Sequence, residues 1–525
     1  MLRIHNVKVK LGQTNYRKIV SQVLNMREKE IHQVKLSKQS VDARRQKVHW
    51  ICSFDFTVDD EEQCLKLHPT LQKVKPYHYE YLPANDKKVV VVGSGPAGLF
   101  CAYVLAQVGQ QVIVVERGKK VEERVKDVET LFEKGILNPQ SNIAFGEGGA
   151  GTFSDGKLTT GIKNHRLQYI LETFVKHGAP DDILYLSKPH IGTDYLRQVL
   201  INMRHDMQQK GVQFMFETQF IDFFEDNNKK KVVVQTPKGK EEIETDALVL
   251  AIGHSARDTY QMLYEKGLSM EPKAFAVGVR IEQSQAFINQ IQYKASATSP
   301  YLKAASYKLA VQTSEKRGVY TFCMCPGGVI VPSMHEEGTL CVNGMSYYQR
   351  DGKNANSAIL VNVNPSDFAS DHPLAGIDFQ RELEKKAFEL GGGNYHAPVQ
   401  LVRDYYEGVV TSSVQDVVPT YSPGYQFVDL NQLFPDFINR NLKEGLLLMN
   451  QKMPGFIQDN TLITGVESRS SAPVRILRKE NYQSTFKDVY PIGEGAGYAG
   501  GIMSAAVDGI MCAEMILRED RNGSC

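Results

Sequence analysis

The hydrophobic positions change their spacing along the chain and predict alternating strands and helices. Residues 88–92, KVVVV, form a continuous run of β-branched side chains, which is typical of a strand buried on both faces of a parallel sheet. Residues 99–109, LFCAYVLAQVG, predict an apolar helix, and residues 112–115, VIVV, predict a second strand. Residues 192–214 predict an amphipathic helix followed by a further strand. This alternation is typical of an α/β domain with a parallel sheet.

The first 82 residues have a different pattern. They read as a strand, a helix, two strands and a short helix near EEQCLKLH, which predicts a small α+β domain of ferredoxin-like type. The following segment, PYHYEYLPANDKK, contains two prolines and predicts a linker.

A glycine motif lies where the first predicted strand meets the first predicted helix. Gly93, Gly95 and Gly98 form a G-x-G-x-x-G pattern, and Glu116 follows Gly98 by 18 residues, at the end of the next strand. In a dinucleotide-binding fold such glycines allow a tight turn, a close approach to the pyrophosphate and close packing of helix on strand. The acid binds a ribose 2′-hydroxyl, so the motif favours FAD or NAD over NADP.

Three further stretches favour FAD. Residues 144–158, AFGEGGAGTFSDGKL, form a second glycine-rich loop, which reaches the same phosphate turn only if the ligand is long. Residues 229–253 predict a β-meander that ends in DALVLAIG, resembling the closing strand of glutathione-reductase-like flavoproteins, with Ile252 in place of the usual Thr. Residues 493–509, GEGAGYAGGIMSAAVDG, contain six glycines, five of which precede a predicted helix. Their backbone is expected to lie against the isoalloxazine, because no Cβ obstructs a flat ligand there.

Composition narrows the class of protein. The 525 residues carry a net charge of +1 and 42% hydrophobic residues, which fits a soluble protein of several domains without a strong overall field. Residues 1–82 hold 15 Lys and Arg against 9 Asp and Glu, so the predicted small domain is basic. The N-terminal residues lack the apolar stretch of a signal peptide, no apolar run reaches 18 residues, and the eight cysteines are sparse. We therefore expect a cytoplasmic protein that does not contact membranes.

The chain resembles the family of uncharacterised bacterial FAD-dependent dehydrogenases, within the glutathione-reductase-like FAD/NAD(P)-binding superfamily. The strings that carry the resemblance are GSGPAG, GEGGAGTFSDGKL, CMCPGG, NGMSYYQRDG, TGVESRSSAPVRI and GEGAGYAGGIMSAAVDG. The resemblance implies FAD as cofactor and redox chemistry, with no agreed substrate. In that superfamily a Gly-Asp pair holds the ribitol, whereas this chain has Gly493 and Glu494.

The predicted organisation is an α/β fold. A Rossmann-like FAD-binding domain is expected to be discontinuous, with residues 87–270 as its first part and residues 446–525 as its second. An inserted mixed-sheet substrate domain is expected at residues 271–445, and the small domain at residues 1–82. The flavin is expected in the crevice between the two larger domains. The predicted cofactor-binding residues are Gly93, Ser94, Gly95, Pro96, Ala97, Gly98, Glu116, Arg117, Gly148, Gly149, Ala150, Gly151, Thr152, Phe220, Ala251, Gly253, Gly493, Glu494, Gly500, Gly501, Ile502 and Met503.

The predicted substrate-binding residues are Arg280, Cys325, Arg469 and Arg475, and no catalytic residue or metal ligand is assigned. The arginines are suited to a bidentate grip on a carboxylate, or alternatively form surface ion pairs. In CMCPGG, Cys323 and Cys325 either form a dithiol beside the flavin or are structural thiols. A regular strand spaces their Cα atoms by roughly 6.6 Å, so a disulfide requires a bend, for which Pro326 and the following glycines are suited.

We therefore predict an FAD-dependent oxidoreductase that moves a hydride between a small organic substrate and flavin. The chain has no second G-x-G-x-x-G between strand and helix, so NAD(P)H is expected to dock only transiently. One alternative is a flavoenzyme acting on RNA guided by the basic N-terminal domain, although nucleic acid is not the favoured partner. Another is a regulatory protein that holds FAD without turnover.

Overall fold

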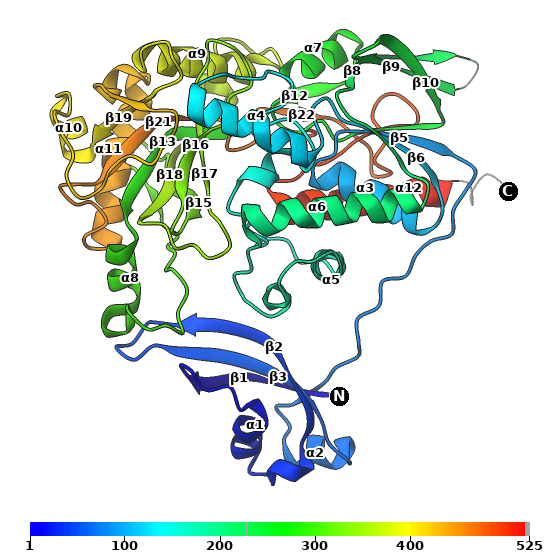
Figure 1. The fold of residues 1–525 in the computed structure, drawn as a ribbon, viewed down its shortest axis with the longest axis vertical. Helices are drawn as coiled ribbons and strands as arrows, with labels where there is room; N and C mark the ends of the chain where they lie inside the picture. The colour runs from blue at the N-terminus through cyan, green and yellow to red at the C-terminus, as the bar shows by residue number, and fades with distance from the viewer. Residues whose placement is uncertain (227–228, 520–525) are drawn as a thin grey trace.

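The computed structural model describes residues 1–226 and 229–519, which form a mixed α/β structure with several sheets. Two large sheets lie side by side in the body, and a smaller N-terminal sheet extends below them (Figure 1).

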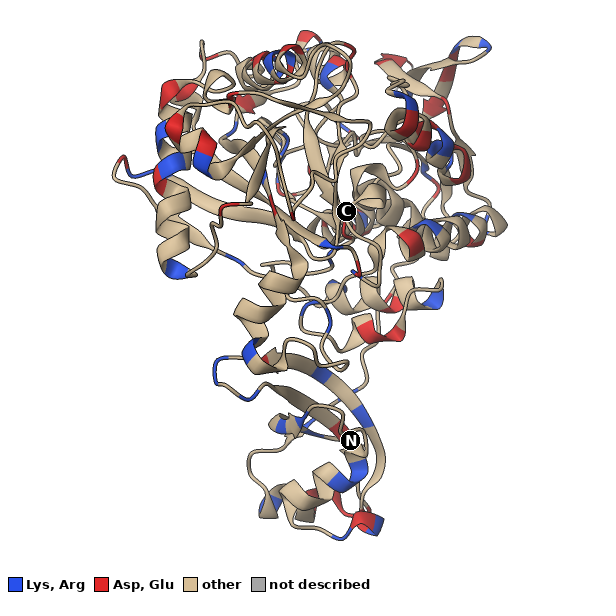
Figure 2. Ribbon diagram, turned by 60° about the vertical axis from the view of Figure 1, so that its left-hand side comes forward, with Lys and Arg blue, Asp and Glu red and all other residues tan. Residues whose placement is uncertain are grey.

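The N-terminal sheet is fully antiparallel, in the order β2-β3-β1-β4. Its buried face contacts the two helices, and its core includes Leu2, Phe54 and Phe56. Its elements are β1 (Leu2–Lys10), α1 (Tyr16–Leu24), η1 (Glu28–Glu30), β2 (His32–Asp42), β3 (His49–Thr57), α2 (Glu61–Leu67) and β4 (Gln72–Lys73). In Figure 2 blue segments run along these strands, whereas red segments gather near α2.

The segment between this sheet and the body is held by tyrosines. The Tyr79 ring stacks on Tyr169 at 4.1 Å between ring centroids, and its hydroxyl donates to Glu514 at 2.9 Å. Tyr81 bonds Tyr169 through their hydroxyls at 2.9 Å. The predicted linker is therefore fixed on the surface of the body.

A five-stranded parallel sheet, in the order β23-β11-β5-β6-β7, forms the first half of the body. Val89 to Val91 are fully buried, as the β-branched run predicted. The strands are β5 (Lys88–Val92), β6 (Gln111–Val115), β7 (Gln213–Met215), β11 (Ala247–Leu250) and β23 (Val489–Pro491). The helices and turns around it are α3 (Pro96–Gln107), α4 (Val121–Lys134), η2 (Gly149–Phe153), α5 (Arg166–Lys176), η3 (Asp181–Leu184), α6 (Gly192–Gln209), α7 (Arg257–Glu265) and α12 (Ile502–Arg518).

One face of the parallel sheet is covered by α3, α6 and α12, which lie together in Figure 1. A three-stranded meander packs on the other face, and it consists of β8 (Gln219–Asp226), β9 (Lys229–Thr236) and β10 (Gly239–Thr245). The sheet is a Rossmann-type fold built from segments that are distant in sequence, because β23 and α12 join it after an insertion of more than two hundred residues.

A seven-stranded mixed sheet forms the second half of the body, in the order β14-β15-β18-β13-β21-β19-β20. Its strands are β13 (Phe275–Ser284), β14 (Ala310–Gln312), β15 (Gly318–Cys325), β18 (Asn354–Val363), β19 (Ala397–Leu401), β20 (Tyr425–Phe427) and β21 (Leu462–Glu467). Around it lie α8 (Gln285–Tyr293), η4 (Lys294–Ser296), η5 (Pro365–Asp367), α9 (Ala375–Leu390), α10 (Val402–Glu407), η6 (Leu430–Gln432) and α11 (Asp436–Lys452). The predicted boundary at residue 445 falls inside α11, and the chain stays with this sheet to the end of β21.

Two short ribbons connect the halves. They are β12 (Met270–Pro272) paired with β22 (Val474–Ile476), and β16 (Val329–Pro332) paired with β17 (Val342–Met345). Helix α9 ends at Leu390, with Gly391 as its C-cap. Within the described residues no helix has the length and apolar character needed to cross a bilayer.

Candidate functional site

The glycines of the first turn are required by contacts between β5, α3 and β11. Gly93 has a φ of +97°, and a Cβ there would collide with the carbonyl oxygen of Ala251. A Cβ on Gly98 would collide with the Gly93 carbonyl. Gly95 caps α3, whose first residue is Pro96, so the free N–H groups of the first helical turn face the end of the sheet.

The second glycine loop lies directly on the first. A Cβ on Gly149 would stand 3.0 Å from the Gly95 α-carbon, and the Gly148 N–H donates to the Ser94 carbonyl at 3.0 Å. The buried Arg124 holds this loop, because its guanidinium donates to the carbonyls of Asn142, Ile143 and Glu147 at 2.7 to 2.8 Å. The two loops therefore form one cradle.

Glu116 connects the same two loops. One carboxylate oxygen accepts from the N–H and hydroxyl of Ser94 at 3.0 and 2.8 Å, and the other accepts from the N–H groups of Gly118 and Gly146 at 2.9 and 3.0 Å. A carboxylate has about four acceptor positions. Glu116 lines the cavity, but protein donors occupy its oxygens, so a ribose hydroxyl would have to share or displace one of them.

The C-terminal glycine cluster completes the cradle. A Cβ on Gly495 would lie 2.7 Å from the Gly253 nitrogen, and a Cβ on Gly151 would lie 3.1 Å from the Ile502 side chain. Helix α12 begins at Ile502, immediately after Gly501, which has a φ of +81°. Segments near positions 95, 150, 253 and 500 thus meet around one cavity.

Most of the residues predicted to bind the cofactor line this cavity. Those that do are Gly93, Gly95, Pro96, Ala97, Glu116, Arg117, Gly149, Ala150, Gly151, Phe220, Ala251, Gly253, Glu494, Gly501 and Ile502. Those that do not line it are the buried Ser94, Gly98, Gly148, Thr152, Gly493 and Met503, which lie behind the lining, and the exposed Gly500. Burial raises the pKa of the Glu494 carboxyl to about 7.

The cavity continues to the seven-stranded sheet, where it is lined by residues that sequence analysis did not assign. They include Asp155, Lys157, Phe322, Cys323, Asn343 and Ser470. Lys157 pairs with Asp155 at 3.1 Å and donates to the Met324 carbonyl. Lys157 lies in the GEGGAGTFSDGKL string. Nothing in the sequence indicates that this loop lysine lies close to Cys323, which is 166 positions later.

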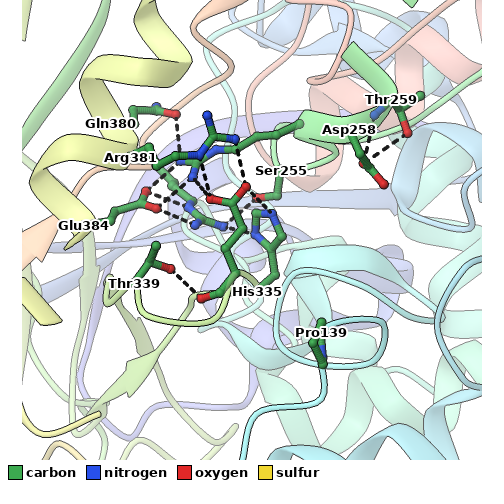
Figure 3. A network of polar contacts seen from close by, with 12 residues as sticks. Pro139, Ser255, Asp258, Thr259, His335, Thr339, Gln380, Arg381 and Glu384 are labelled. Carbon is green, nitrogen blue, oxygen red and sulfur yellow. Dashed lines mark hydrogen bonds and ion pairs between the residues drawn. The ribbon is translucent and has the colours of Figure 1, made fainter. Parts of the chain in front are cut away.

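Arg469 reaches the cavity from a buried ionic network. Its guanidinium grips both oxygens of Glu384 at 2.9 and 2.7 Å, and Arg257 binds the same carboxylate at 2.9 and 3.0 Å. Figure 3 shows Glu384 of α9 pointing toward His335 and Ser255, and the Arg469 guanidinium also contacts His335 Nδ1 at 2.5 Å. Burial opposes ionisation of Glu384, but the two guanidiniums outweigh it and hold its pKa well below the ordinary value.

The other predicted substrate residues lie outside the lining. Arg280 is fully buried and pairs with Glu467 at 2.5 Å, directly behind Cys323. Arg475 pairs with Glu271 at 3.2 Å on the β12–β22 ribbon. Cys325 is buried behind the cavity, and it is Cys323 that reaches the lining.

His190 and His254 are histidines whose charge bears on the chemistry of this region. His254 lines the cavity and bonds Ser255 at 2.8 Å, and burial, followed by the nearby arginines, lowers its pKa to about 4. His190 contacts the Tyr348 carbonyl at 2.9 Å, and burial lowers its pKa to about 4. Both rings are therefore neutral at pH 7.

The shape and donors of the cavity fit a long dinucleotide. Gly253 and Gly501 line the cavity with bare backbone, where a Cβ would meet no protein atom within 4 Å, and the first turns of α3 and α12 both begin at its wall. Helix N-termini favour anionic groups, so α3 is suited to a pyrophosphate and α12 to the electron-rich edge of a reduced flavin ring.

Comparison with protein families gives three matches. Residues 274–470 match the family "FAD-dependent protein, C-terminal domain-like", residues 52–136 match "Pyridine nucleotide-disulphide oxidoreductase", and residues 1–57 match a domain of unknown function. The chain is 44% identical over 531 residues to an "Uncharacterized protein" of Clostridium beijerinckii, with 99% of both chains covered. A shorter match is to an L-amino-acid oxidase of Crotalus adamanteus. It covers 43 residues at 54% identity, which is 8% of this chain and 8% of the oxidase.

Two solved structures are similar at low identity. The flavin-dependent halogenase CmlS has 13% identity and a TM-score of 0.38, with 84% of this chain and 59% of the halogenase covered. This chain therefore spans less than two thirds of the halogenase. A flavoprotein/dehydrogenase from Cytophaga hutchinsonii has 12% identity and a TM-score of 0.34, with 83% of this chain and 80% of that protein covered.

Proposed function

We propose that this chain, which belongs to the same family of FAD-dependent proteins as the Clostridium beijerinckii protein, is a dehydrogenase that moves a hydride between FAD and a small organic molecule. FAD is its cofactor, and an FAD-dependent oxidoreductase is the class of enzyme that the family indicates. Bound FAD supplies the two-electron chemistry, while the chain supplies position, charge and exclusion of water.

The observation that carries the proposal is the continuity of the cavity. It runs from the glycine cradle at Gly95 and Gly149 to a polar end at Lys157, Cys323 and Arg469 on the second sheet. A reacting molecule at the polar end would lie between the two halves of the body. Asp155, which lines this end, is fully buried, and Lys157 and Cys323 beside it are partly buried.

The roles proposed for the chain follow from position. The first turn of α3 would hold the pyrophosphate through backbone N–H groups, and the first turn of α12 would stabilise negative charge at the pyrimidine edge of the ring. Glu494 would bind a ribitol hydroxyl, for which a carboxyl that is partly protonated near pH 7 can either donate or accept. NAD(P)H is the proposed electron donor or acceptor, docking transiently from outside.

Anaerobic mixing tests this proposal. The purified yellow protein is mixed with NADH or NADPH, and the flavin absorbance is followed in the absence of oxygen. We expect one of the two nucleotides to bleach the flavin rapidly, followed by recovery of the colour when an electron acceptor is added. Stable binding of FAD with no bleaching by either nucleotide would instead favour the alternative of a protein that holds FAD without turnover.

A further inference from the structure

We propose that Cys323 and Cys325 form a redox-active dithiol that exchanges two electrons with FAD and passes them to a small disulfide that enters the cavity. This inference rests on the proposed function and adds to it the class of substrate.

The position of the two sulfurs divides their roles. Cys323 is partly exposed and lines the cavity together with Glu494 and Ile502 of the cofactor cradle. Cys325 is fully buried behind it. An external disulfide can therefore reach Cys323 first, and Cys325 is placed to attack the mixed disulfide that forms on Cys323.

The strand is bent at the cysteines themselves. The pairing of β15 with β18 shifts register between Phe322 and Cys325, and Cys323 has a φ of +41°, which is in the left-handed region that β-branched and other non-glycine residues rarely adopt. Such conformations are strained and concentrate at functional sites. The bend that a disulfide requires is thus present at Cys323 itself and does not depend on Pro326.

The bulge turns the Cys325 side chain back toward Cys323. The Cys325 Sγ donates to the Cys323 carbonyl at 3.2 Å. In a regular strand the separation of the two Cα atoms would be close to the upper limit for a disulfide. Here the Cys325 sulfur already contacts the backbone of the residue that carries the partner sulfur.

Buried cations surround the pair. Arg280 Nη2 donates to the Cys323 carbonyl at 2.5 Å and to the Cys325 Sγ at 3.5 Å, while Lys157 donates to the carbonyl of Met324 between them. A third cation, Arg350, shares the carboxylate of Asp155 with Lys157.

Carboxyl groups also lie around the pair. Asp155 is ionised, since Lys157 and Arg350 outweigh the burial that opposes its charge and lower its pKa. The pKa of Glu467, which pairs with Arg280, and the pKa of Glu494 are raised to about 7, first by burial and in part by negative charge on Cys323. Lys157 and Arg280 are the two cations that contact the cysteine segment, and both favour a thiolate on Cys323.

Thiol acidity agrees with this arrangement. The hydrogen bond from Cys325 lowers the pKa of Cys323 to about 5 against the opposing effect of burial, and Lys157 and Arg280 lower it further. Burial, followed by the bond to Cys323, raises the pKa of Cys325 well above its ordinary value. A thiolate that faces the cavity and a protonated thiol behind it are the two states that thiol–disulfide exchange requires.

The proposed step balances. In one direction the Cys323 thiolate and the Cys325 thiol lose two electrons and one proton as their sulfurs form one S–S bond, and FAD accepts the two electrons and that proton as the reduced anion. In the other direction the reduced anion returns the electrons and proton and the S–S bond opens. A small disulfide then accepts the electrons from the dithiol and leaves as two thiols, with one proton from the Cys325 thiol and one from water.

Electron counting on the holoenzyme tests the proposal without a turnover assay. After treatment with hydroxyethyl disulfide and its removal, the protein is titrated anaerobically with dithionite. We expect four electrons per FAD, two for the flavin and two for the disulfide. Cys323→Ser should take two. In Cys325→Ser no second thiol displaces the mixed disulfide that forms on Cys323, so mass spectrometry should find the hydroxyethylthio adduct on Cys323 in this variant and not in the wild type. Cys64→Ser, which alters a buried thiol on α2 of the N-terminal domain, should still take four.

Met324 lies between the two cysteines and allows direct identification of the bond. After alkylation of free thiols, cyanogen bromide releases residues 271–324, 325–334 and 335–345, which hold Cys323, Cys325 and Cys341 separately. Oxidised wild-type protein should yield the first two fragments joined. This mapping needs no variant, so it is informative even where a substitution prevents folding.

The outcomes separate the two proposals. Two electrons per FAD in the treated wild type, with all three fragments alkylated and separate, would overturn the dithiol but leave the flavin dehydrogenase standing. A link to the fragment with Cys341 would also overturn it. A protein that binds no FAD would remove the proposed function together with this inference.

Discussion

The α-carbon of Gly95 faces the position where a side chain on Gly149 would begin, with only 3.0 Å between them. These residues are 54 positions apart, yet their backbones are in contact at the base of the cavity. The contact joins the phosphate turn of the parallel sheet to the second glycine loop. FAD binding should therefore depend on the absence of side chains at both positions.

Gly149→Val tests that contact. The residue has a φ of +63°, where a non-glycine residue costs about 1–2 kcal/mol, and the Cβ would also push against Gly95. We expect the Kd for FAD to rise by about tenfold or more, since each tenfold corresponds to about 1.4 kcal/mol. Fluorescence titration of the apoprotein with FAD measures this. Gly161→Val is the control, because nothing lies within 4 Å of its Cβ position and its backbone is not left-handed. Equal affinities would contradict the cradle.

Glu384→Gln should destabilise the fold strongly. The buried carboxylate neutralises Arg257 and Arg469, and removing one partner of a buried ionic cluster costs about 3–5 kcal/mol. Denaturant unfolding at pH 7 gives the free energy. Glu382→Gln, on an exposed position of the same helix, should change it by less than about 0.5 kcal/mol. An unchanged free energy of unfolding in Glu384→Gln would show that the network adds nothing to stability.

The same carboxylate predicts a pH dependence. Its pKa in the folded state lies below the ordinary value, so its contribution to stability is present above pH of about 4.3 and is lost as pH falls through the folded-state pKa. The difference in unfolding free energy between wild type and Glu384→Gln should therefore shrink on acidification below that pH. A difference in unfolding free energy that stays constant down to the lowest pH at which the protein folds would contradict a lowered pKa for Glu384 in the folded state.

Alkylation of Cys323 should follow its lowered pKa. An ordinary thiol has a pKa of about 8.5 and loses reactivity below it, whereas Cys323 should react with iodoacetamide at a nearly constant rate until the pH approaches about 5. Since the bond from Cys325 is the first cause of the shift, Cys325→Ser should move the profile to higher pH. Mass spectrometry of the fragment ending at Met324 follows the rate. An unshifted profile in the variant would exclude that hydrogen bond as the cause.

Removal of residues 1–74 should leave FAD binding unchanged. All of the lining residues belong to the body, and the N-terminal sheet contacts it through few groups, such as the Gln39 N–H that donates to the Tyr185 carbonyl at 2.7 Å. Equilibrium titration with FAD checks this. Salt-sensitive RNA binding that disappears with the truncation would favour an RNA-directed flavoenzyme, whereas RNA binding that is absent or unaffected by salt would count against it.

Local patterns in the sequence predicted much of the parallel sheet. The β-branched run at 88–92, the glycines that follow it and the strand at 112–115 are adjacent in the chain, so their periodicity and spacing carry the fold. The strands and helices expected in residues 1–82 are also found. Gly391 follows the end of α9, and a Cβ there would collide with the carbonyl oxygen of His396, five positions further along the chain.

What the sequence could not predict depends on contacts between distant side chains. Arg469 was expected to grip a substrate, but Glu384, 85 positions away, already occupies its guanidinium. Glu116 was expected to bind ribose, but Ser94 and Gly146 donate to its oxygens. Lys157 meets the cysteine pair only because the second glycine loop folds against the other sheet. Pairings of this kind have no spacing rule along the chain.

Distant glycine segments grip a single FAD, so the purified protein should carry one flavin per chain. To measure this, the protein is denatured, and the released flavin is identified and quantified against the chain. We expect a yellow protein that releases about one FAD per chain and takes it up again after refolding. A colourless protein that releases no FAD and takes up none when it is supplied would rule out a shared FAD site at these glycines.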